Sequence, residues 1–358
     1  MSAQTPRGWW LTERELREWF QQLIADGTKL VGPVDEDDLR IFRQVTSADS
    51  ISLAAGKTQW SPKEFLLPRS EPLYAYTFED GAPRLRDPEP LLADQAIVGV
   101  RPCDAAGLAR LDSVFLSGTR DPHYQRRRDR TTVVSLSCVD ATPDCFCTAA
   151  GGTPHGEEGA DAILIPLAGR WLLRSITPKG AGLLARQRHA WPESTAEHDV
   201  AAENQRRRVE ESMRRSPVMP EWPALLDRAF DLPVWQHLGE RCMSCSICSY
   251  VCPSCSCFDM QDEGNPWCGS LCRSWDSCTF GLFTRHASGH NPRPTQVERY
   301  RQRVLHKFAY FPMERDGRLM CVGCGRCILL CPAGIDIYEA VRAVVEAQRN
   351  EVGASERS

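Results

Sequence analysis

Several signals that define common protein classes are missing from this sequence. The start, Met1 to Glu13, has no basic segment followed by an apolar run, and no apolar stretch approaches the ~20 residues needed to span a bilayer. The net charge is only −4, which favours neither a nucleic acid nor an anionic membrane as a partner. We therefore expect a cytoplasmic protein with no membrane span and no nucleic-acid partner.

Signatures of nucleotide binding and of hydrolysis are also missing. No G-x-G-x-x-G follows a strand-like run, so binding of a nicotinamide or a flavin by this chain is not supported. The stretch from Ala54 to Thr58 resembles the end of a P-loop, but Ile51 stands where the first glycine is required. There is no H-E-x-x-H and no local Ser/His/Asp set. We accordingly assign no catalytic residue and expect no substrate site in this chain.

Cysteine, in contrast, is abundant. The chain has 17 cysteines in three groups, which span Cys103 to Cys147, Cys242 to Cys278 and Cys321 to Cys331. In a reducing compartment such groups usually bind metals or carry redox chemistry and do not form structural disulfides.

Two cysteine motifs have the spacing of bacterial ferredoxins. Each reads C-x-x-C-x-x-C-x-x-x-C-P, from Cys242 to Pro253 and again from Cys321 to Pro332. Three closely spaced thiolates wrap one 4Fe–4S cluster, and the cysteine before proline ligates the other cluster. We therefore assign one cluster to Cys242, Cys245, Cys248 and Cys331, and a second cluster to Cys321, Cys324, Cys327 and Cys252.

A pair of zinc sites is the alternative interpretation, because C-x-x-C also forms zinc knuckles. Zinc needs four ligands, usually as two separated pairs. It does not explain a third cysteine two residues further on, nor the Cys-Pro that ends both motifs. The spacing favours iron–sulfur clusters.

The segment between the motifs, residues 254–320, is longer than in a compact ferredoxin. This separation and a helical pattern over 297–311 favour an α-helical-ferredoxin arrangement, followed by a helix over about 337–347.

Five cysteines in or near this segment match no cluster spacing. We interpret them as structural thiols, with a supplementary cluster or a zinc site as alternatives; they are Cys255, Cys257, Cys268, Cys272 and Cys278.

The first cysteine group follows a predicted β-α-β unit. Apolar runs at 96–100 and 132–136 flank a helical pattern at 104–115, and two parallel strands end at the same sheet edge. Cys103 follows the first run and Cys138 the second, with Cys145 and Cys147 in the next loop. We predict that these four thiolates bind a third 4Fe–4S cluster; buried cysteines that bind nothing are the alternative.

These patterns predict an α+β protein of two domains. Residues 1–232 form an α/β domain with the additional cluster, and residues 233–358 form an α-helical ferredoxin-like domain with two 4Fe–4S clusters. Within the first domain, Thr12 and Glu15 fit a capping box before a helix. A hairpin is predicted over 163–176.

Strings around the cysteines resemble a known family, the beta subunits of cytoplasmic nickel–iron sulfhydrogenases and the related A subunits of anaerobic sulfite reductases. The resemblance covers about residues 95 to 340. The strings are Val98-Gly-Val-Arg-Pro-Cys-Asp104, Asp144-Cys-Phe-Cys147, Cys252-Pro-Ser-Cys-Ser-Cys-Phe-Asp259, Trp275-Asp-Ser-Cys278, His286-Ala-Ser-Gly-His-Asn-Pro-Arg293 and His306-Lys-Phe308.

The resemblance implies an electron-transfer subunit of a soluble multisubunit oxidoreductase. One partner would be an NAD(P)H-reactive subunit with flavin and a 2Fe–2S cluster. The other would be a hydrogenase small subunit or, alternatively, the catalytic subunit of a sulfite reductase. Two other classes stay open: a chain with its own site for reducing a sulfur compound, and a structural zinc protein.

Overall fold

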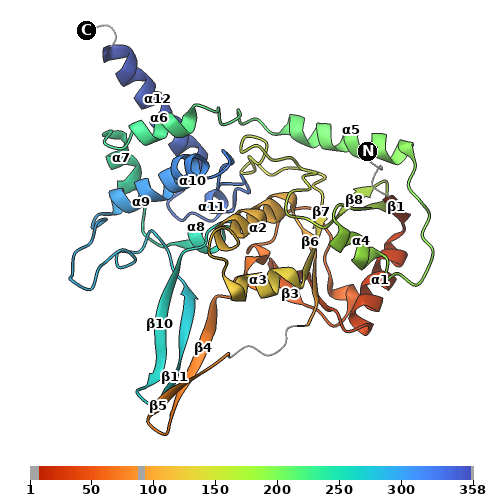
Figure 1. Ribbon diagram of the computed structural model, residues 1–358. Coiled ribbons are helices and arrows are strands. Elements are labelled where there is room, and N and C mark those ends of the chain that lie inside the picture. Colours follow the sequence, from red (N-terminus) through yellow and green to blue (C-terminus); the bar gives the residue numbers. More distant parts are fainter. Residues whose placement is uncertain (1–7, 88–92, 356–358) are drawn as a thin grey trace. The chain divides into compact units, whose positions relative to one another are not determined.

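The computed structural model describes residues 8–87 and 93–355 and divides the chain into two compact units (Figure 1). The first unit comprises Met1–Leu67 and Pro90–Arg215, and the second comprises Pro68–Glu89 and Ser216–Ser358. Residues 1–7, which belong to the stretch considered above for a leader, lie outside the described residues.

The first unit is built on a seven-stranded sheet of order β1-β9-β8-β7-β6-β2-β3. Strands β2, β6, β7 and β8 run parallel, and the other three pair antiparallel at the two sides. The strands are β1 (Gly8–Leu11), β2 (Lys29–Glu36), β3 (Leu39–Gln44), β6 (Gln95–Val100), β7 (Thr131–Leu136), β8 (Ala162–Leu167) and β9 (Arg170–Ser175).

The predicted β-α-β unit is confirmed. Strands β6 and β7 pair in parallel from Gln95 opposite Thr131 onward, and α2 (Pro102–Phe115) connects them together with α3 (Pro122–Asp129). All residues of both strands are buried, which explains their continuous apolar character. The carboxyl ends of the two strands therefore lie at one edge of the sheet, as expected.

Helices cover both faces of this sheet. Helix α1 (Glu13–Ala25) begins at Thr12, whose side chain and that of Glu15 form the predicted capping box. Its buried face joins a core with α4 (Pro178–Leu184), while Ala202 of α5 (Ala196–Ser212) packs on the opposite face. The hairpin predicted over 163–176 is present as β8 and β9.

The second unit has a helical part that carries both cysteine motifs. One continuous helical segment, formed by α9, η3 and α10, runs between the motifs as expected, and η3 is a π-helix. The helices are α6 (Trp222–Arg228), α7 (Val234–Glu240), α8 (Ile247–Tyr250), α9 (Gln296–Leu305), η3 (His306–Tyr310), α10 (Phe311–Glu314), α11 (Arg326–Leu329) and α12 (Ile337–Ser355).

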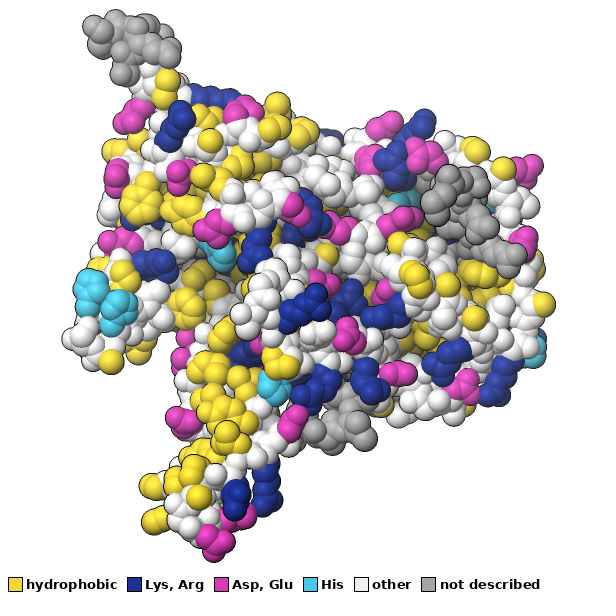
Figure 2. All heavy atoms as spheres, viewed as in Figure 1, with side chains coloured by type: hydrophobic (Ala, Val, Ile, Leu, Met, Phe, Trp, Pro, Cys, Tyr) yellow, Lys and Arg dark blue, Asp and Glu magenta, His cyan; other side chains and the backbone are white. Residues whose placement is uncertain are grey.

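The second unit also contains a four-stranded antiparallel sheet of order β10-β11-β4-β5. Its strands are β4 (Ser70–Glu79), β5 (Ala82–Arg86), β10 (Phe258–Asn265) and β11 (Cys268–Trp275). Large apolar side chains remain exposed on this sheet and its turns, among them Phe78, Leu85 and Trp267. Figure 2 shows apolar groups gathered on the face of this sheet. The sequence predicted an α-helical ferredoxin-like domain over residues 233–358, and this sheet was not among the predicted elements.

The division of the chain differs from the boundary expected between residues 232 and 233. The first unit ends at Arg215, and residues 68–89 belong to the second unit although they lie early in the chain. The reason is strand pairing, since β4 pairs along β11 from Ser70 to Thr77.

Within the part of the chain that the structure describes, no helix has the length and apolar character to cross a membrane.

Candidate iron–sulfur site

The two ferredoxin-spaced motifs fold with the same backbone. Ser244 and Ser246 of the first motif have φ of 60° and 61°, and the equivalent Gly323 and Gly325 of the second have φ of 64° and 75°. Ser246 and Gly325 each directly precede a four-residue helix, α8 or α11, that carries the third cysteine of its motif. The repeat seen in the sequence is therefore also a repeat of local structure.

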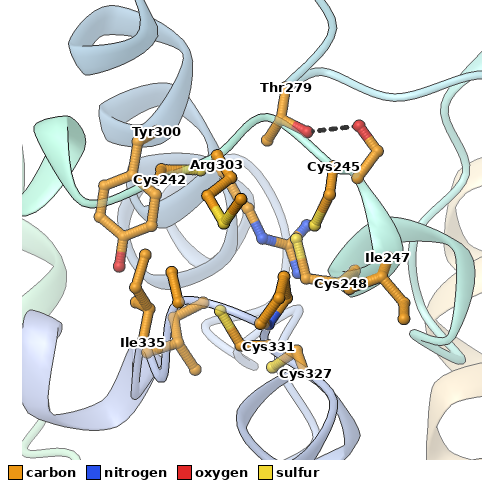
Figure 3. A pocket seen from close by; sticks show the side chains of 15 residues that line it. Cys242, Cys245, Ile247, Cys248, Thr279, Tyr300, Arg303, Cys327, Cys331 and Ile335 are labelled. Atoms are coloured by element: carbon orange, nitrogen blue, oxygen red, sulfur yellow. Dashed lines mark hydrogen bonds between the residues drawn. The ribbon is translucent and has the colours of Figure 1, made fainter.

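Cysteines of both motifs surround one cavity (Figure 3). The first three cysteines of the first motif line it together with the last cysteine of the second, Cys331; Cys327 also reaches its wall. The rest of the lining is mostly apolar, including Met243, Ile247 and Ile335. The structure thus brings together the four side chains that the spacing assigned to one cluster.

Two polar side chains on α9 face these cysteines. The Gln296 amide Nε2 lies 3.0 Å from the Cys242 sulfur, and the Tyr300 side chain lines the cavity. The Tyr300 hydroxyl is buried and has no hydrogen-bond partner among the described residues. Burial raises the pKa of Tyr300 most strongly, so this hydroxyl is a protonated donor. An iron–sulfur group would fit this cavity, because four thiolates could hold it and its sulfur atoms could accept the hydrogen bond of the unpartnered Tyr300 hydroxyl.

The remaining four motif cysteines form a second set. Burial first, and then the nearby Cys252 and Cys324, raise the pKa of Cys321 to about 12. Burial also raises the pKa of Cys327, which has Cys324, Cys321 and Cys252 as electrostatic neighbours. The structure therefore gathers these four thiols, and a bound group that stabilises thiolates would reverse the raised pKa values of Cys321 and Cys327.

Two buried cations accompany these sets, and neither was predicted from the sequence. The Lys307 ammonium Nζ lies 3.4 Å from the Cys252 sulfur, and an Arg303 guanidinium nitrogen lies 3.6 Å from the Cys255 sulfur. Their spacing of four residues on a helix was visible in the sequence. Nothing in the sequence indicated that this face would turn toward the cysteines.

The five cysteines outside the motif spacing fall into two places. Cys255 and Cys278 are buried and Cys257 is half-buried; Cys255 neighbours Cys252, and the thiol of Cys257 contacts that of Cys278. Cys268 and Cys272 lie on β11, the first exposed and the second buried. Among the residues described, no three or more His, Cys, Asp or Glu side chains are arranged to hold a single metal ion.

The cysteines of the first unit lie at the carboxyl edge of the parallel strands. Cys103 is in the first turn of α2 after β6, and Cys138 comes two residues after β7. Burial first, then Cys138 and Cys145, raise the pKa of Cys147 to about 12. Three of the four predicted ligands are therefore electrostatic neighbours, and Cys103 lies in the first turn of α2 at the same edge.

Basic residues also accompany this set. Lys57 forms an ion pair with Asp144, and its Nζ lies 3.4 Å from the Cys145 sulfur. Arg101 is buried and donates to the carbonyl oxygens of Ser137 and Ala54, at 3.1 and 2.7 Å. Lys57 belongs to the stretch that resembled a P-loop, so its role here was not apparent from the sequence.

Comparison with known proteins identifies the family. Residues 241–335 match the family of 4Fe-4S dicluster domains. The chain is 32% identical to sulfhydrogenase 2 subunit beta of Pyrococcus furiosus over 343 residues, which are 92% of this chain and 96% of that protein. The chain belongs to the sulfhydrogenase beta-subunit family. The resemblance seen in the sequence is confirmed, and the dicluster match of this family member spans both cysteine motifs.

Proposed function

We propose that this chain is the electron-transfer subunit of a multisubunit oxidoreductase and holds two 4Fe–4S clusters in its second unit. One cluster would bind Cys242, Cys245, Cys248 and Cys331, and the other would bind Cys252, Cys321, Cys324 and Cys327. The observation that carries the proposal is the single cavity lined by cysteines of both motifs. The dicluster-domain match over residues 241–335 supports it independently.

Clusters of this kind, when bound, take up and release single electrons. The chain's own residues would supply everything else. The thiolates hold the group, and apolar side chains such as Ile247 and Ile335 keep water away from it. Gln296 donates to the Cys242 sulfur, and Tyr300 has a hydroxyl available to donate toward the cavity.

A third 4Fe–4S cluster in the first unit is also part of the proposal. Its ligands would be Cys103, Cys138, Cys145 and Cys147. Support comes from their place at one sheet edge and from the buried Arg101, whose charge lowers the pKa of Cys138 against the larger effect of burial.

The partners we propose follow from the relative's name. That protein is a subunit of a sulfhydrogenase, which favours a hydrogenase module over a sulfite reductase as one partner. The other partner would be a flavin- and 2Fe–2S-containing subunit that reacts with NAD(P)H. The chain would relay electrons between them in the cytoplasm, without a substrate site of its own.

Iron and acid-labile sulfide, measured per chain on protein purified without air, test the cluster assignment. About twelve iron atoms are expected for three clusters, and about eight would restrict binding to the two motif sets. Zinc in place of iron would contradict the proposal entirely.

Activity of the isolated chain tests whether it only conducts electrons. With reduced viologen as donor and polysulfide as acceptor, we expect no turnover above the background of viologen and polysulfide alone. Turnover that is lost with the iron would instead indicate a sulfur-reducing site in this chain.

A further inference from the structure

Arg303 and Lys307 place two positive charges deep inside the second unit. Each side chain belongs to a residue that is 3% exposed. They are four residues apart on the continuous helical segment of α9 and η3, so they lie on one face of it. Two like charges at this spacing repel each other, so their burial requires compensation from elsewhere.

Lys307 touches both halves of the second cysteine set. Its Nζ lies 3.4 Å from the Cys252 sulfur and 3.2 Å from the Ser254 hydroxyl. Its carbonyl oxygen accepts a hydrogen bond of 3.1 Å from the backbone N–H of Met320, which directly precedes Cys321. The residue therefore links the end of the first motif to the start of the second.

Arg303 lies against the first cysteine set. One guanidinium nitrogen donates to the Cys248 carbonyl oxygen at 2.8 Å, and the other lies 3.1 Å from the Ser249 hydroxyl and 3.6 Å from the Cys255 sulfur. Figure 3 shows the guanidinium group directed among the thiols that line the cavity.

Neither cation has a carboxylate partner in the part of the chain that the structure describes. All their side-chain contacts are to sulfur, hydroxyl or carbonyl groups. Burial is the largest single influence on the pKa of both side chains and lowers it, but the neighbouring cysteines together raise it by more. Cys248 raises the pKa of Arg303 most, and Cys252 that of Lys307. Sulfur ligands are thus the negative groups that compensate these charges.

We infer that Arg303 and Lys307 are the fixed countercharges of the two clusters and set their reduction potentials. This inference rests on the proposed binding of both clusters. The reduced cluster carries one more negative charge than the oxidised cluster, so a buried cation stabilises the reduced cluster more. Each cation therefore makes the reduction potential of the nearby cluster more positive. Lys57 in the first unit differs, because Asp144 already balances its charge.

The test is a redox titration of the cluster-loaded chain, followed anaerobically by electron paramagnetic resonance. The neutral variants are Lys307→Gln and Arg303→Gln. We expect each to make one-electron reduction of at least one cluster about tenfold or more less favourable. A tenfold change corresponds to a potential about 59 mV more negative.

Arg301→Gln is the matched control. It removes the same charge from the same helix, but Arg301 is half-exposed and packs on Phe230, with a hydrogen bond to its carbonyl oxygen. The cluster reduction potentials of Arg301→Gln should equal those of the unchanged chain. An unchanged or more positive potential in either loaded neutral variant would overturn the inference.

Variants that keep the charge cover the case in which a neutral variant does not assemble. If Lys307→Gln or Arg303→Gln loses iron while Lys307→Arg and Arg303→Lys retain it, the countercharge role is supported. Loss of iron from the charge-keeping variants as well would mean that shape matters and would overturn the inference. If the unchanged chain itself holds no reducible iron, the proposed function fails first.

Discussion

At the scale of single residues, the second motif uses glycine where the first uses serine in the same left-handed conformation. A residue with a Cβ is strained there, and the strain is greatest for a β-branched side chain. In the first motif, Ser244 and Ser246 have hydroxyl groups that bond to Thr279, which compensates part of this cost. The tight backbone of both motifs thus depends on residues that tolerate positive φ.

We predict a graded response at Gly325, whose φ is 75°. Gly325→Val should destabilise the folded chain by about 1–3 kcal/mol, because a β-branched residue resists this conformation. Gly325→Ser, which copies Ser246, should cost less. Thermal unfolding of the loaded protein without air measures both, and equal melting temperatures for the two variants would contradict the strain argument.

Residue-level contacts set the limit of what the sequence could predict about the site. The motif spacing grouped the first three cysteines of the first motif with Cys331, and these four line one cavity, which Cys327 of the other set also reaches. The contacts of Gln296, Arg303 and Lys307 depend on how a distant helix packs, and no local pattern records that packing.

At the scale of elements, the hairpin of β4 and β5 is held in the second unit by more than backbone pairing. Glu71 on β4 lies opposite Arg273 on β11, and both side chains are 3% exposed. Their carboxylate oxygen and Nε are 2.8 Å apart. Buried ion pairs of this kind are costly to break, because the remaining partner stays charged and desolvated.

We predict that Arg273→Met lowers the stability of the second unit by about 3–5 kcal/mol. The double variant Glu71→Leu with Arg273→Met should recover most of this loss, because no unpaired charge remains buried. Arg86→Met is the control, since its exposed pair with Glu79 in the same sheet is worth about 1 kcal/mol or less. Urea unfolding curves of the four proteins measure this, and a double variant as unstable as Arg273→Met would contradict it.

The elements that the sequence predicted are those whose signals are local. Strands β6 and β7 are continuous apolar runs, and the Thr12 capping box lies within four residues. Strand β10, in contrast, reads FDMQDEGN and is rich in residues that strands usually lack. Its sheet also joins segments as far as 204 residues apart in sequence (Ser274 pairs with Ser70), which no local pattern reveals.

At the scale of the whole molecule, the cysteine sets are divided between two units that each have their own sheet. The motif sets lie in residues 242–331 of the second unit, and the remaining set lies in residues 103–147 of the first. Loss of one set should therefore leave the other unit's iron in place.

We predict that Cys138→Ser with Cys147→Ser lowers the iron content by about four atoms per chain, the content of one 4Fe–4S cluster. The paramagnetic resonance signals of the second unit should not change. Cys268→Ser, at an exposed position on β11, is the matched control and should retain all iron. An unchanged iron content in the double variant would remove the third cluster from the proposal.

The placement of residues 68–89 also has a consequence for synthesis on the ribosome. Strand β4 ends at Glu79, but its partner β11 begins only at Cys268. At 5–20 residues per second, roughly 10–40 s separate the emergence of the two strands. During that time β4 can pair with β5, but its other edge has no native partner, so the nascent chain carries an open and partly aromatic strand edge. We expect the growing chain to need a chaperone most during this interval, and less during the synthesis of the cysteine motifs.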